Sequence, residues 1–288
     1  MPELPEVETI RRDLSTRVVD KKIIALDARD HKVADKNLAK ILVGKKFIKI
    51  ERRGKLLAFL LSDGQYLLAH LKMTGQLIYK EKRTRSKEKI VAGGHKISPS
   101  DLQVPNNFTR VIFSFVDKSQ LFFNDMRRFG YLKLASADEK EKIFNENFGI
   151  EPLTENFKFK NFSALFARRK TNLKALLMNQ KLIAGIGNIY ADEACYCAGL
   201  LPWRKAGSLT AGELKRLFSS ITEVLKVALK NRGTSFDDFV DAQGEKGGHY
   251  NFLNVYERDG EKCRRCKSII KKTRHAGRGT HFCLKCQK

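Results

Sequence analysis

The sequence predicts an α+β protein with a β-rich N-terminal part behind one helix, a helical middle part and a cysteine-rich end. β-like runs separated by turn residues fill about the first 135 positions, whereas apolar residues recur at helical spacing after residue 155. Four cysteines then form two closely spaced pairs near the end. We therefore expect domains at 1–135, 156–250 and 251–288, with a charged linker at 136–155.

The N-terminal part opens with a helical pattern, since Val7, Ile10, Leu14 and Val18 recur at spacings of three to four. Pro5 is tolerated in the first turn of such a helix. Strand-like runs follow, first around Phe47–Ile50 and then as two predicted hairpins: Leu56–Leu61 with Tyr66–Leu71, and Arg110–Val116 with Gln120–Asn124. The polar, basic stretch Lys80–Asn107 is expected to be a long loop.

Helical patterns dominate the middle of the chain. They cover Phe162–Arg169, Leu173–Gln180 and Ile189–Cys197. Thr210 and Glu213 have capping-box spacing, and the apolar residues that follow them mark one face of a further helix, which Gly233 can close. The glycine-rich segment Gln243–His249 is expected to be a mobile loop.

The charge balance points to a polyanionic partner. Lys and Arg number 56 against 32 for Asp and Glu, which gives a formal net charge of +24. Nucleic acid is favoured over an anionic membrane surface. The longest apolar run, Leu56–Leu61, is too short to span a bilayer, and the charged start lacks the apolar core of a signal peptide. We expect a soluble, intracellular protein.

The four C-terminal cysteines predict one structural zinc ion. They are Cys263, Cys266, Cys283 and Cys286, with sixteen residues between the two pairs. The segment between the pairs is rich in Lys and Arg, so the hairpin either contacts phosphates or is a structural staple with a solvated basic face. Cys195 and Cys197 lie in an apolar-rich segment and are expected to be core thiols.

Two short motifs are ambiguous when taken alone. Gly185–Asn188 lacks the third glycine and the preceding strand of a dinucleotide site, so it is either an ordinary turn or a phosphate-binding helix start. Pro2 follows a removable Met1, and a freed secondary amine could attack a sugar carbon as a covalent nucleophile. Taken alone, a proline at this place followed by Glu is usually structural, since it is typical of a helix start, where Glu3 and Glu6 are also favoured.

A series of motifs resolves both ambiguities, because it resembles the bacterial formamidopyrimidine-DNA glycosylase family (Fpg or MutM) over nearly the whole chain. The segments that carry the resemblance, in order, are Met1–Thr9, Arg52–Lys55, His70–Gly75, Asp125–Gly130, Lys181–Glu193, and Arg278 with the four cysteines. The resemblance implies an N-terminal β-sandwich, a helical domain with a helix–two-turn–helix motif and a zinc-finger β-hairpin.

The resemblance also implies catalytic roles. Pro2 corresponds to the Schiff-base nucleophile and Glu3 to the acid that helps to open the sugar ring. Lys55 is implied to assist at the backbone phosphate and in elimination, and Arg278 in the later elimination step. Zinc is the one implied cofactor.

DNA-binding roles are implied for five further residues. Arg169 and Asn188 correspond to phosphate ligands. Met73, Arg127 and Phe129 correspond to the triad that fills the gap left by an extruded nucleotide. The residue types fit this task, because apolar wedges offset part of the lost stacking and a guanidinium can hydrogen-bond the abandoned base.

The chain departs from the family pattern at three places. Phe108 stands where relatives usually have a DNA-contacting histidine, and Met126 where many have proline. The basic stretch 80–107 is longer than usual and offers replacement cations, namely Lys82, Arg83, Arg85 and Lys96. None of these changes touches Pro2.

We therefore expect a monomeric, bacterial-type enzyme of base excision repair, acting in the cytoplasm with the nucleoid. It would bind double-stranded DNA containing oxidised bases or abasic sites, excise 8-oxoguanine or formamidopyrimidines and nick the strand by β,δ-elimination. The segment 233–252 resembles the family's base-capping loop, which favours purines. The alternatives are an endonuclease VIII-like glycosylase for oxidised pyrimidines and a non-catalytic protein that binds damaged DNA.

Overall fold

The computed structural model describes residues 1–81, 89–94, 103–234, 248–275 and 277–288. The chain forms two compact units, Met1–Phe144 with Asn231–Tyr250, and Asn145–Lys230 with Asn251–Lys288. Each unit has a hydrophobic core of its own.

The division differs from the sequence-based boundaries at one segment. Asn231–Tyr250, which we expected in the helical domain, groups with the N-terminal unit. Two contacts with the first helix explain this: the Thr234 amide donates to Glu6 Oε1 at 2.9 Å, and Arg232 Nη2 pairs with Asp13 Oδ2 at 2.7 Å. Sequence patterns do not reveal such contacts between distant segments. The domain boundaries that we predicted at residues 135, 155 and 250 remain predictions.

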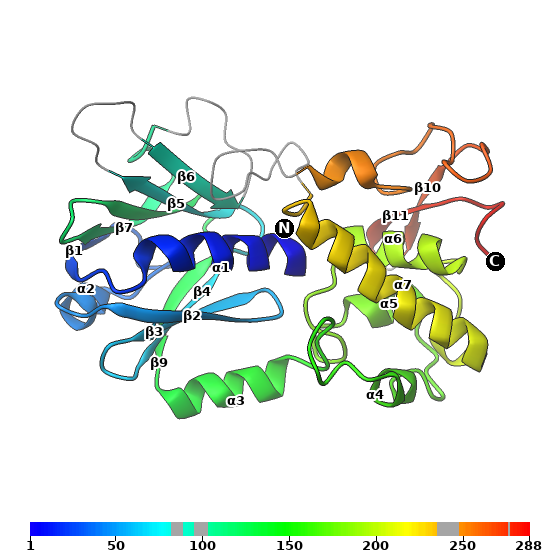
Figure 1. Cartoon of the computed structure of the whole chain (residues 1–288), viewed down its shortest axis with the longest axis horizontal. Coiled ribbons are helices and arrows are strands. Elements are labelled where there is room, and N and C mark those ends of the chain that lie inside the picture. The colour runs from blue at the N-terminus through cyan, green and yellow to red at the C-terminus, as the bar shows by residue number, and fades with distance from the viewer. Residues whose placement is uncertain (82–88, 95–102, 235–247, 276) are drawn as a thin grey trace. The chain divides into compact units, whose positions relative to one another are not determined.

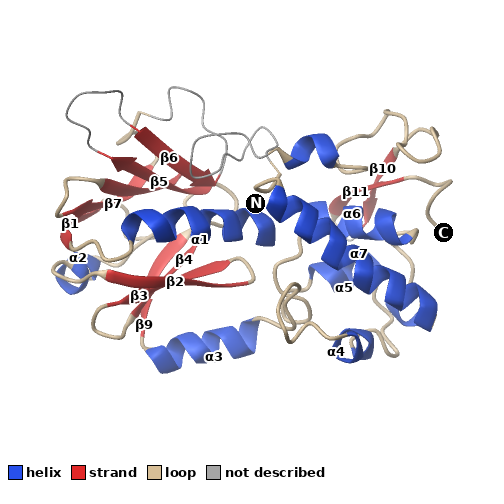
Figure 2. Cartoon of the chain, in the orientation of Figure 1, coloured by secondary structure: helices blue, strands red, loops and turns tan. Residues whose placement is uncertain are grey.

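The first unit contains two antiparallel sheets (Figures 1 and 2). The five-stranded sheet has the order β1 (Ile23–Ala28), β7 (Thr109–Phe115), β8 (Gln120–Asp125), β5 (Gly75–Glu81), β6 (Lys89–Gly94). The four-stranded sheet has the order β2 (Phe47–Arg53), β3 (Leu56–Leu61), β4 (Tyr66–His70), β9 (Tyr131–Ala135). Helix α1 (Leu4–Val18) contacts strands of both sheets, and the short α2 (Leu38–Leu42) contacts β1.

The predicted N-terminal elements are confirmed. The four apolar residues of α1 that recur at helical spacing are buried in the core that both sheets share. Both predicted hairpins form, β3 with β4 and β7 with β8. This is the α+β arrangement with an N-terminal β-sandwich that the sequence predicted.

The prediction of one long loop over Lys80–Asn107 is wrong in part. Strand β5 extends to Glu81, and β6 pairs with it in the register Lys80↔Ile90. The hydrogen bonds to β5 define β6, and its glycine-containing sequence has no clear alternation of apolar residues. The four proposed replacement cations of this stretch, Lys82, Arg83, Arg85 and Lys96, lie outside the described residues.

The predicted linker contains a helix, α3 (Ala137–Asn147). The helices that follow are α4 (Phe159–Ala164), α5 (Leu173–Met178), α6 (Asn188–Ala198) and α7 (Ala211–Lys230). The last three confirm the predicted helical segments. Helix α4 ends at Ala164, so the predicted helical segment Phe162–Arg169 is too long at its C-terminal end; the chain continues in turns up to Arg168, which has a left-handed φ of 56°. The unit ends in a hairpin of β10 (Lys271–His275) and β11 (Arg278–Phe282).

The segment between α5 and α6 is held by Gln180. Its Nε2 donates to the carbonyl of Ile186 at 2.7 Å, and its Oε1 accepts from the Gly185 amide at 2.9 Å. Gly185 has a φ of 95°, a backbone conformation that favours glycine. These bonds fix the direction in which α6 begins, so Gly185–Asn188 is a braced helix start.

The core of the second unit is built from the buried faces of its helices, and Cys195 is fully buried in it while Cys197 is half-buried. Burial raises the pKa of the Cys195 thiol well above its ordinary range. The prediction of a core thiol therefore holds for Cys195. Among the described residues, no helix has the length and apolar character that a bilayer crossing requires.

Candidate active site and nucleic-acid interface

The N-terminus forms a capped helix start. Pro2 is buried and directly precedes the N-cap residue Glu3, while Met1 is 54% exposed. The Glu3 amide donates to Glu6 Oε2 at 2.8 Å, and the Glu3 side chain in turn accepts from the Glu6 amide. Both carboxylates are nearly inaccessible to solvent. The arrangement fixes Glu3 beside Pro2, at the positive end of the helix dipole.

Glu8 connects α1 to the turn that carries Lys55. Its carboxylate pairs with Arg11 and Arg12 on the helix and with Arg52 Nε at 3.0 Å on β2. Arg52 Nη1 also donates to the carbonyl of Gly54 at 2.8 Å. Burial alone would raise the pKa of Glu8, but the three guanidinium groups hold it at about 2. The helix of the proposed nucleophile and the β2–β3 turn are thus linked through one carboxylate.

Lys55 is only 4% exposed and lies next to a residue that sequence reasoning did not single out, His70. His70 pairs in register with Leu56, the residue after Lys55. Burial, and then the charges of Lys72 and Lys55, lower the pKa of His70 to about 3. Its Nδ1 accepts from the Lys72 amide at 3.0 Å, so the neutral ring carries its proton on Nε2. The motif His70–Gly75 contained the signal for this residue.

The three predicted wedge residues lie together. The guanidinium carbon of Arg127 lies 4.7 Å from the ring centre of Phe129, and its Nη1 lies 3.5 Å from Met73 Sδ. Met73 and Phe129 are 41% and 53% exposed, which is unusual for side chains of this size. An exposed group of one cation and two large apolar side chains suits insertion into a nucleic-acid stack.

Buried Asp125 supports this group and was missed as a separate site residue. Its Oδ1 accepts from the Thr74 hydroxyl and, at 3.1 Å, from the Arg127 amide. Its Oδ2 accepts from the Gly130 amide at 2.6 Å. A Cβ on Gly130 would lie 2.9 Å from the Phe123 ring and 3.0 Å from Asp125 Oδ2, so only glycine fits there. Asp125 therefore fixes both ends of the turn at 126–129.

A second acid holds the same turn from another side. Asp30 is 6% exposed and pairs with Arg128, whose φ of 59° places it in the left-handed region. The hydrogen bond from Arg128 lowers the pKa of Asp30, and a further contribution comes from Arg110, 3.9 Å away.

The two residues that depart from the family pattern lie in the same unit. Phe108 is half-buried, and its amide donates to Asn106 Oδ1. Met126 is 49% exposed.

The second unit contains the two predicted phosphate ligands. Asn188 is the first residue of α6 rather than part of the preceding turn; its Nδ2 donates to the Tyr256 hydroxyl at 3.2 Å. Asn188 Oδ1 has no hydrogen-bond partner among the described residues, and a rotation of the amide exchanges the two atoms. Arg169 is exposed, and its carbonyl accepts from the Gly207 amide. The guanidinium group of Arg169 is therefore open to solvent, whereas the amide oxygen of Asn188 is buried at the start of α6.

Arg278 is exposed at the first position of β11, beside the turn of the finger hairpin. It lines a cavity of about 220 Å³ together with polar residues of α5 and the hairpin, among them Asn172, Lys174 and His275. Pro2, Glu3 and Lys55 belong to the first unit and Arg278 to the second.

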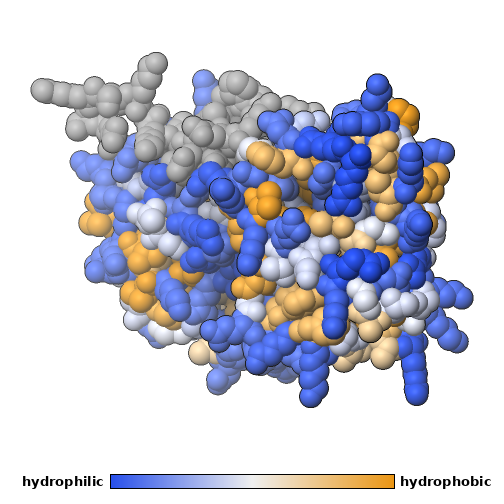
Figure 3. All heavy atoms as spheres, turned by 45° about the vertical axis from the view of Figure 1, so that its right-hand side comes forward, coloured by the Kyte–Doolittle hydropathy of each residue, from blue (hydrophilic) through white to orange (hydrophobic). Residues whose placement is uncertain are grey.

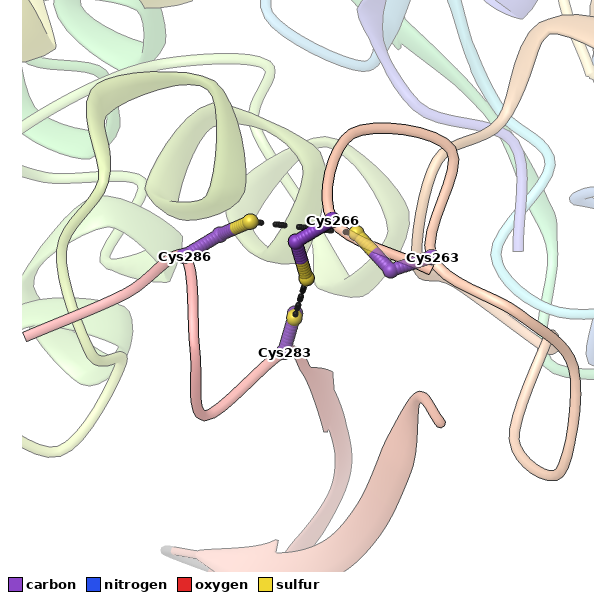
Figure 4. Close-up of side chains that lie close together, drawn as sticks. All are labelled: Cys263, Cys266, Cys283 and Cys286. Atoms are coloured by element: carbon purple, nitrogen blue, oxygen red, sulfur yellow. Dashed lines mark hydrogen bonds between the residues drawn. The ribbon is translucent and has the colours of Figure 1, made fainter. Parts of the chain in front are cut away.

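The four cysteines converge as predicted (Figure 4). Their Sγ atoms lie within 4.8 Å of one another, with Cys263–Cys286 at 3.8 Å and Cys266–Cys283 at 3.4 Å. Zinc–sulfur bonds of about 2.3 Å in a tetrahedron put sulfurs about 3.8 Å apart, so the set fits zinc. Burial and then the neighbouring thiols raise the pKa of Cys286 to about 12, and a bound divalent cation would offset this cost of ionisation.

Two buried acids of α6 attach the finger to the helices. Glu193 accepts hydrogen bonds from the amides of Asn254, Val255 and Tyr256 at 2.8–3.0 Å. Asp192 forms an ion pair with Lys174 Nζ at 2.7 Å and accepts from the His281 amide at 2.9 Å.

Hydrophilic side chains cover much of the molecular face that Figure 3 shows, as expected for a chain with a formal net charge of +24.

Comparison with known proteins agrees with this geometry. The formamidopyrimidine-DNA glycosylase N-terminal domain matches residues 1–132, the H2TH domain of the same enzyme 148–239, and the zinc finger found in FPG and IleRS 260–288. Formamidopyrimidine-DNA glycosylases of Desulfitobacterium hafniense and Pelotomaculum thermopropionicum are 40% and 38% identical to the chain. Both matches cover 100% of this chain, and 100% and 99% of the relatives.

Solved structures of Lactococcus lactis Fpg are similar over the whole chain. A complex with abasic-site DNA has a TM-score of 0.85 at 34% identity and covers 99% of both chains. Complexes of a mutant with Fapy-dG DNA and of the wild type with oxidised-pyrimidine DNA have TM-scores of 0.87 and 0.85 at 35% and 36% identity. Both cover 100% of the two chains. The chain therefore belongs to the formamidopyrimidine-DNA glycosylase family.

Proposed function

We propose that the protein is a DNA glycosylase and AP lyase of base excision repair that removes oxidised purines through the amine of Pro2. The observation that carries the proposal is the helix start, where Pro2 directly precedes the N-cap residue Glu3 and follows an exposed Met1. Removal of Met1 gives Pro2 a secondary amine at the surface of a fixed helix. Such an amine forms a covalent iminium with a sugar aldehyde carbon.

The reaction follows from this group. The Pro2 nitrogen bonds to C1′ of the deoxyribose while the N-glycosidic bond breaks and its electron pair leaves with the base. The sugar ring opens as the iminium forms, and Glu3 supplies the proton that the ring oxygen O4′ takes up. Loss of a C2′ proton then breaks the C3′–O bond, and loss of a C4′ proton from the conjugated iminium breaks the C5′–O bond; in each case the electron pair of the broken bond leaves with the phosphate. Water finally releases the amine.

Two buried residues set the proton balance at this amine. Lys55 is a cation in the same unit, and a positive charge near the amine disfavours its protonation and keeps it nucleophilic. Glu3 is buried beside Pro2 at the start of the helix, so its carboxyl group is held next to the proposed nucleophile, where the acid of this reaction is needed.

The exposed triad completes the lesion site. Met73 and Phe129 enter the stack when the damaged nucleotide is extruded, and Arg127 hydrogen-bonds the base that is left unpaired. Extrusion costs a few kcal/mol, which the inserted side chains offset in part. Asp125 keeps the triad preformed, so little ordering is needed on binding.

The second unit binds the backbone. Asn188 and Arg169 donate to phosphates, and Arg278 on the zinc hairpin assists the later elimination. Zinc supplies structure here, since four thiolates complete its coordination. We further propose a monomer that acts on the bacterial chromosome in the cytoplasm, in association with the nucleoid. The segment 233–252, which would cap a purine, lies largely outside the described residues.

Two matched duplexes test the substrate, one with 8-oxoguanine opposite cytosine and one with thymine glycol opposite adenine. We expect faster excision of 8-oxoguanine, and preferential excision of thymine glycol would assign the pyrimidine branch instead. The Glu3→Gln variant should lose base excision, with Glu146→Gln as an exposed control. Lesion binding without excision by the wild type would identify a non-catalytic DNA-binding protein.

A further inference from the structure

His281, on β11, has one ring nitrogen that the fold leaves without a partner. The side chain is 1% exposed, and Nε2 forms no hydrogen bond within the described residues. The other nitrogen, Nδ1, lies 3.3 Å from Asp192 Oδ2, which also accepts from the His281 amide. A buried carboxylate therefore orients the ring and keeps Nε2 pointing at a fixed place. A buried polar atom without a partner costs about 1–3 kcal/mol, so it calls for an explanation.

Two carboxylates face that nitrogen. Asp259 Oδ1 lies 3.5 Å and Glu257 Oε1 3.7 Å from His281 Nε2. Both distances exceed a good N–H···O hydrogen bond. They are close to the distance between two ligand atoms bound to one tetrahedral zinc ion, which is about 3.4 Å when the metal–ligand bonds are 2.0–2.2 Å long. The three ligand atoms all lie within 4.8 Å of one another.

We propose that Glu257, Asp259 and His281 form a second divalent-metal site, separate from the four cysteines and suited to zinc. Imidazole and carboxylate donors with one position left for water are a common zinc set. The Asp192–His281 contact supplies the carboxylate behind the histidine that orients metal-bound imidazoles. Because Lys174 neutralises Asp192, the charge of a bound metal would be balanced by the two outer carboxylates, Glu257 and Asp259.

Lys272 is the competitor for this site. Its Nζ lies 3.5 Å from Glu257 Oε2 and 3.7 Å from Asp259 Oδ1, and it stands opposite His281 in the β10–β11 register. The Lys272 side chain is 42% exposed, so it can swing into solvent when a metal enters. Two exposed acids and a displaced lysine make this a weaker site than the cysteine site. A bound metal would tie the segment 257–259 to the strand that begins with Arg278.

Cobalt titration tests the proposal on the full chain purified with one zinc retained at the cysteines. We expect wild-type protein to bind one further Co²⁺ with weak visible bands and no thiolate charge transfer. The Glu257→Gln/Asp259→Asn variant, which changes exposed side chains, should bind at least tenfold more weakly, whereas Glu261→Gln in the same segment should match the wild type. Lys272→Gln should bind more tightly than the wild type.

Nitrogen-15 spectra of the histidines give a readout independent of stoichiometry. Saturating Zn²⁺ should move the Nε2 resonance of His281 to the range of a metal-bound nitrogen. The proposal is overturned if the wild type binds no further Co²⁺, or if the double variant binds as tightly as the wild type. It is also overturned if Nε2 of His281 keeps a proton at saturating Zn²⁺, which would identify an imidazolium ion pair with the two acids.

Discussion

Glu8 offers a sharp test of how the proposed nucleophile helix is positioned. The Glu8→Gln substitution removes the charge that three arginines share and releases Arg52 from α1. The pKa of Glu8 falls from 4.5 to about 2 on folding, and the residue is 9% exposed. At 1.36 kcal/mol per pKa unit, this shift corresponds to about 3 kcal/mol of free energy of unfolding.

The pH dependence has a definite sign. Since the pKa is depressed in the folded state, the stabilisation is fully present above pH 4.5 and is lost as the pH falls towards 2. The variant should therefore unfold at lower urea at pH 7, and its difference from the wild type should shrink between pH 4.5 and pH 2. Circular dichroism is the suitable probe, because the single tryptophan, Trp203, lies in the second unit. Glu146→Gln serves as the exposed control.

The Glu8→Gln variant should also be a slower enzyme. Arg52 also holds the carbonyl of Gly54, so its release loosens the turn before Lys55 and should lower the rate of base excision at saturating substrate. The reasoning is refuted if the difference in unfolding free energy between wild type and variant is the same at pH 7 and pH 3. A difference at pH 7 below about 0.5 kcal/mol, the usual effect of a surface substitution, would refute it as well.

Three further substitutions test other parts of the account. Gly130→Ala places a methyl group against Asp125 and should cost about 1–3 kcal/mol and several-fold in lesion affinity; an unchanged melting temperature would contradict the close approach. Asp30 supports the triad through Arg128, so Asp30→Asn should raise KM for lesion duplexes several-fold and should affect cleavage of a preformed abasic site less. Equal effects on both substrates would argue against this support. Cys266→Ser should lose bound zinc, measured by mass spectrometry, together with duplex affinity; full zinc content in this variant would remove Cys266 from the metal site.

Regular periodicity made most of the fold predictable. Helix α1 and the hairpins β3–β4 and β7–β8 follow from apolar spacing and turn residues, and the cysteine spacing predicted the convergence in Figure 4. Strand β6 was missed because its hydrogen bonds to β5 define it and its own sequence shows no alternation. The grouping of segment 231–250 with α1 depends on Glu6 and Asp13, which sequence patterns do not link to it.

The residues to which the candidate site owes its proposed chemistry could be predicted, but most of the residues that hold them in place could not. Pro2, Lys55 and Arg127 could be named because the motifs that contain them resemble those of a known family. Asp125 and His70 begin two of these motifs, but no role could be assigned to them, because a buried carboxylate or a neutral histidine acquires its role from its partners in the folded chain. Such contacts are properties of the folded chain.

The most direct measurement is borohydride reduction of the enzyme with an 8-oxoguanine:cytosine duplex, followed by mass spectrometry of the tryptic peptides. The account predicts one DNA adduct, on the nitrogen of Pro2 in chains that have lost Met1. An adduct on Lys55 or any other residue, or full excision by chains that retain Met1, would contradict it.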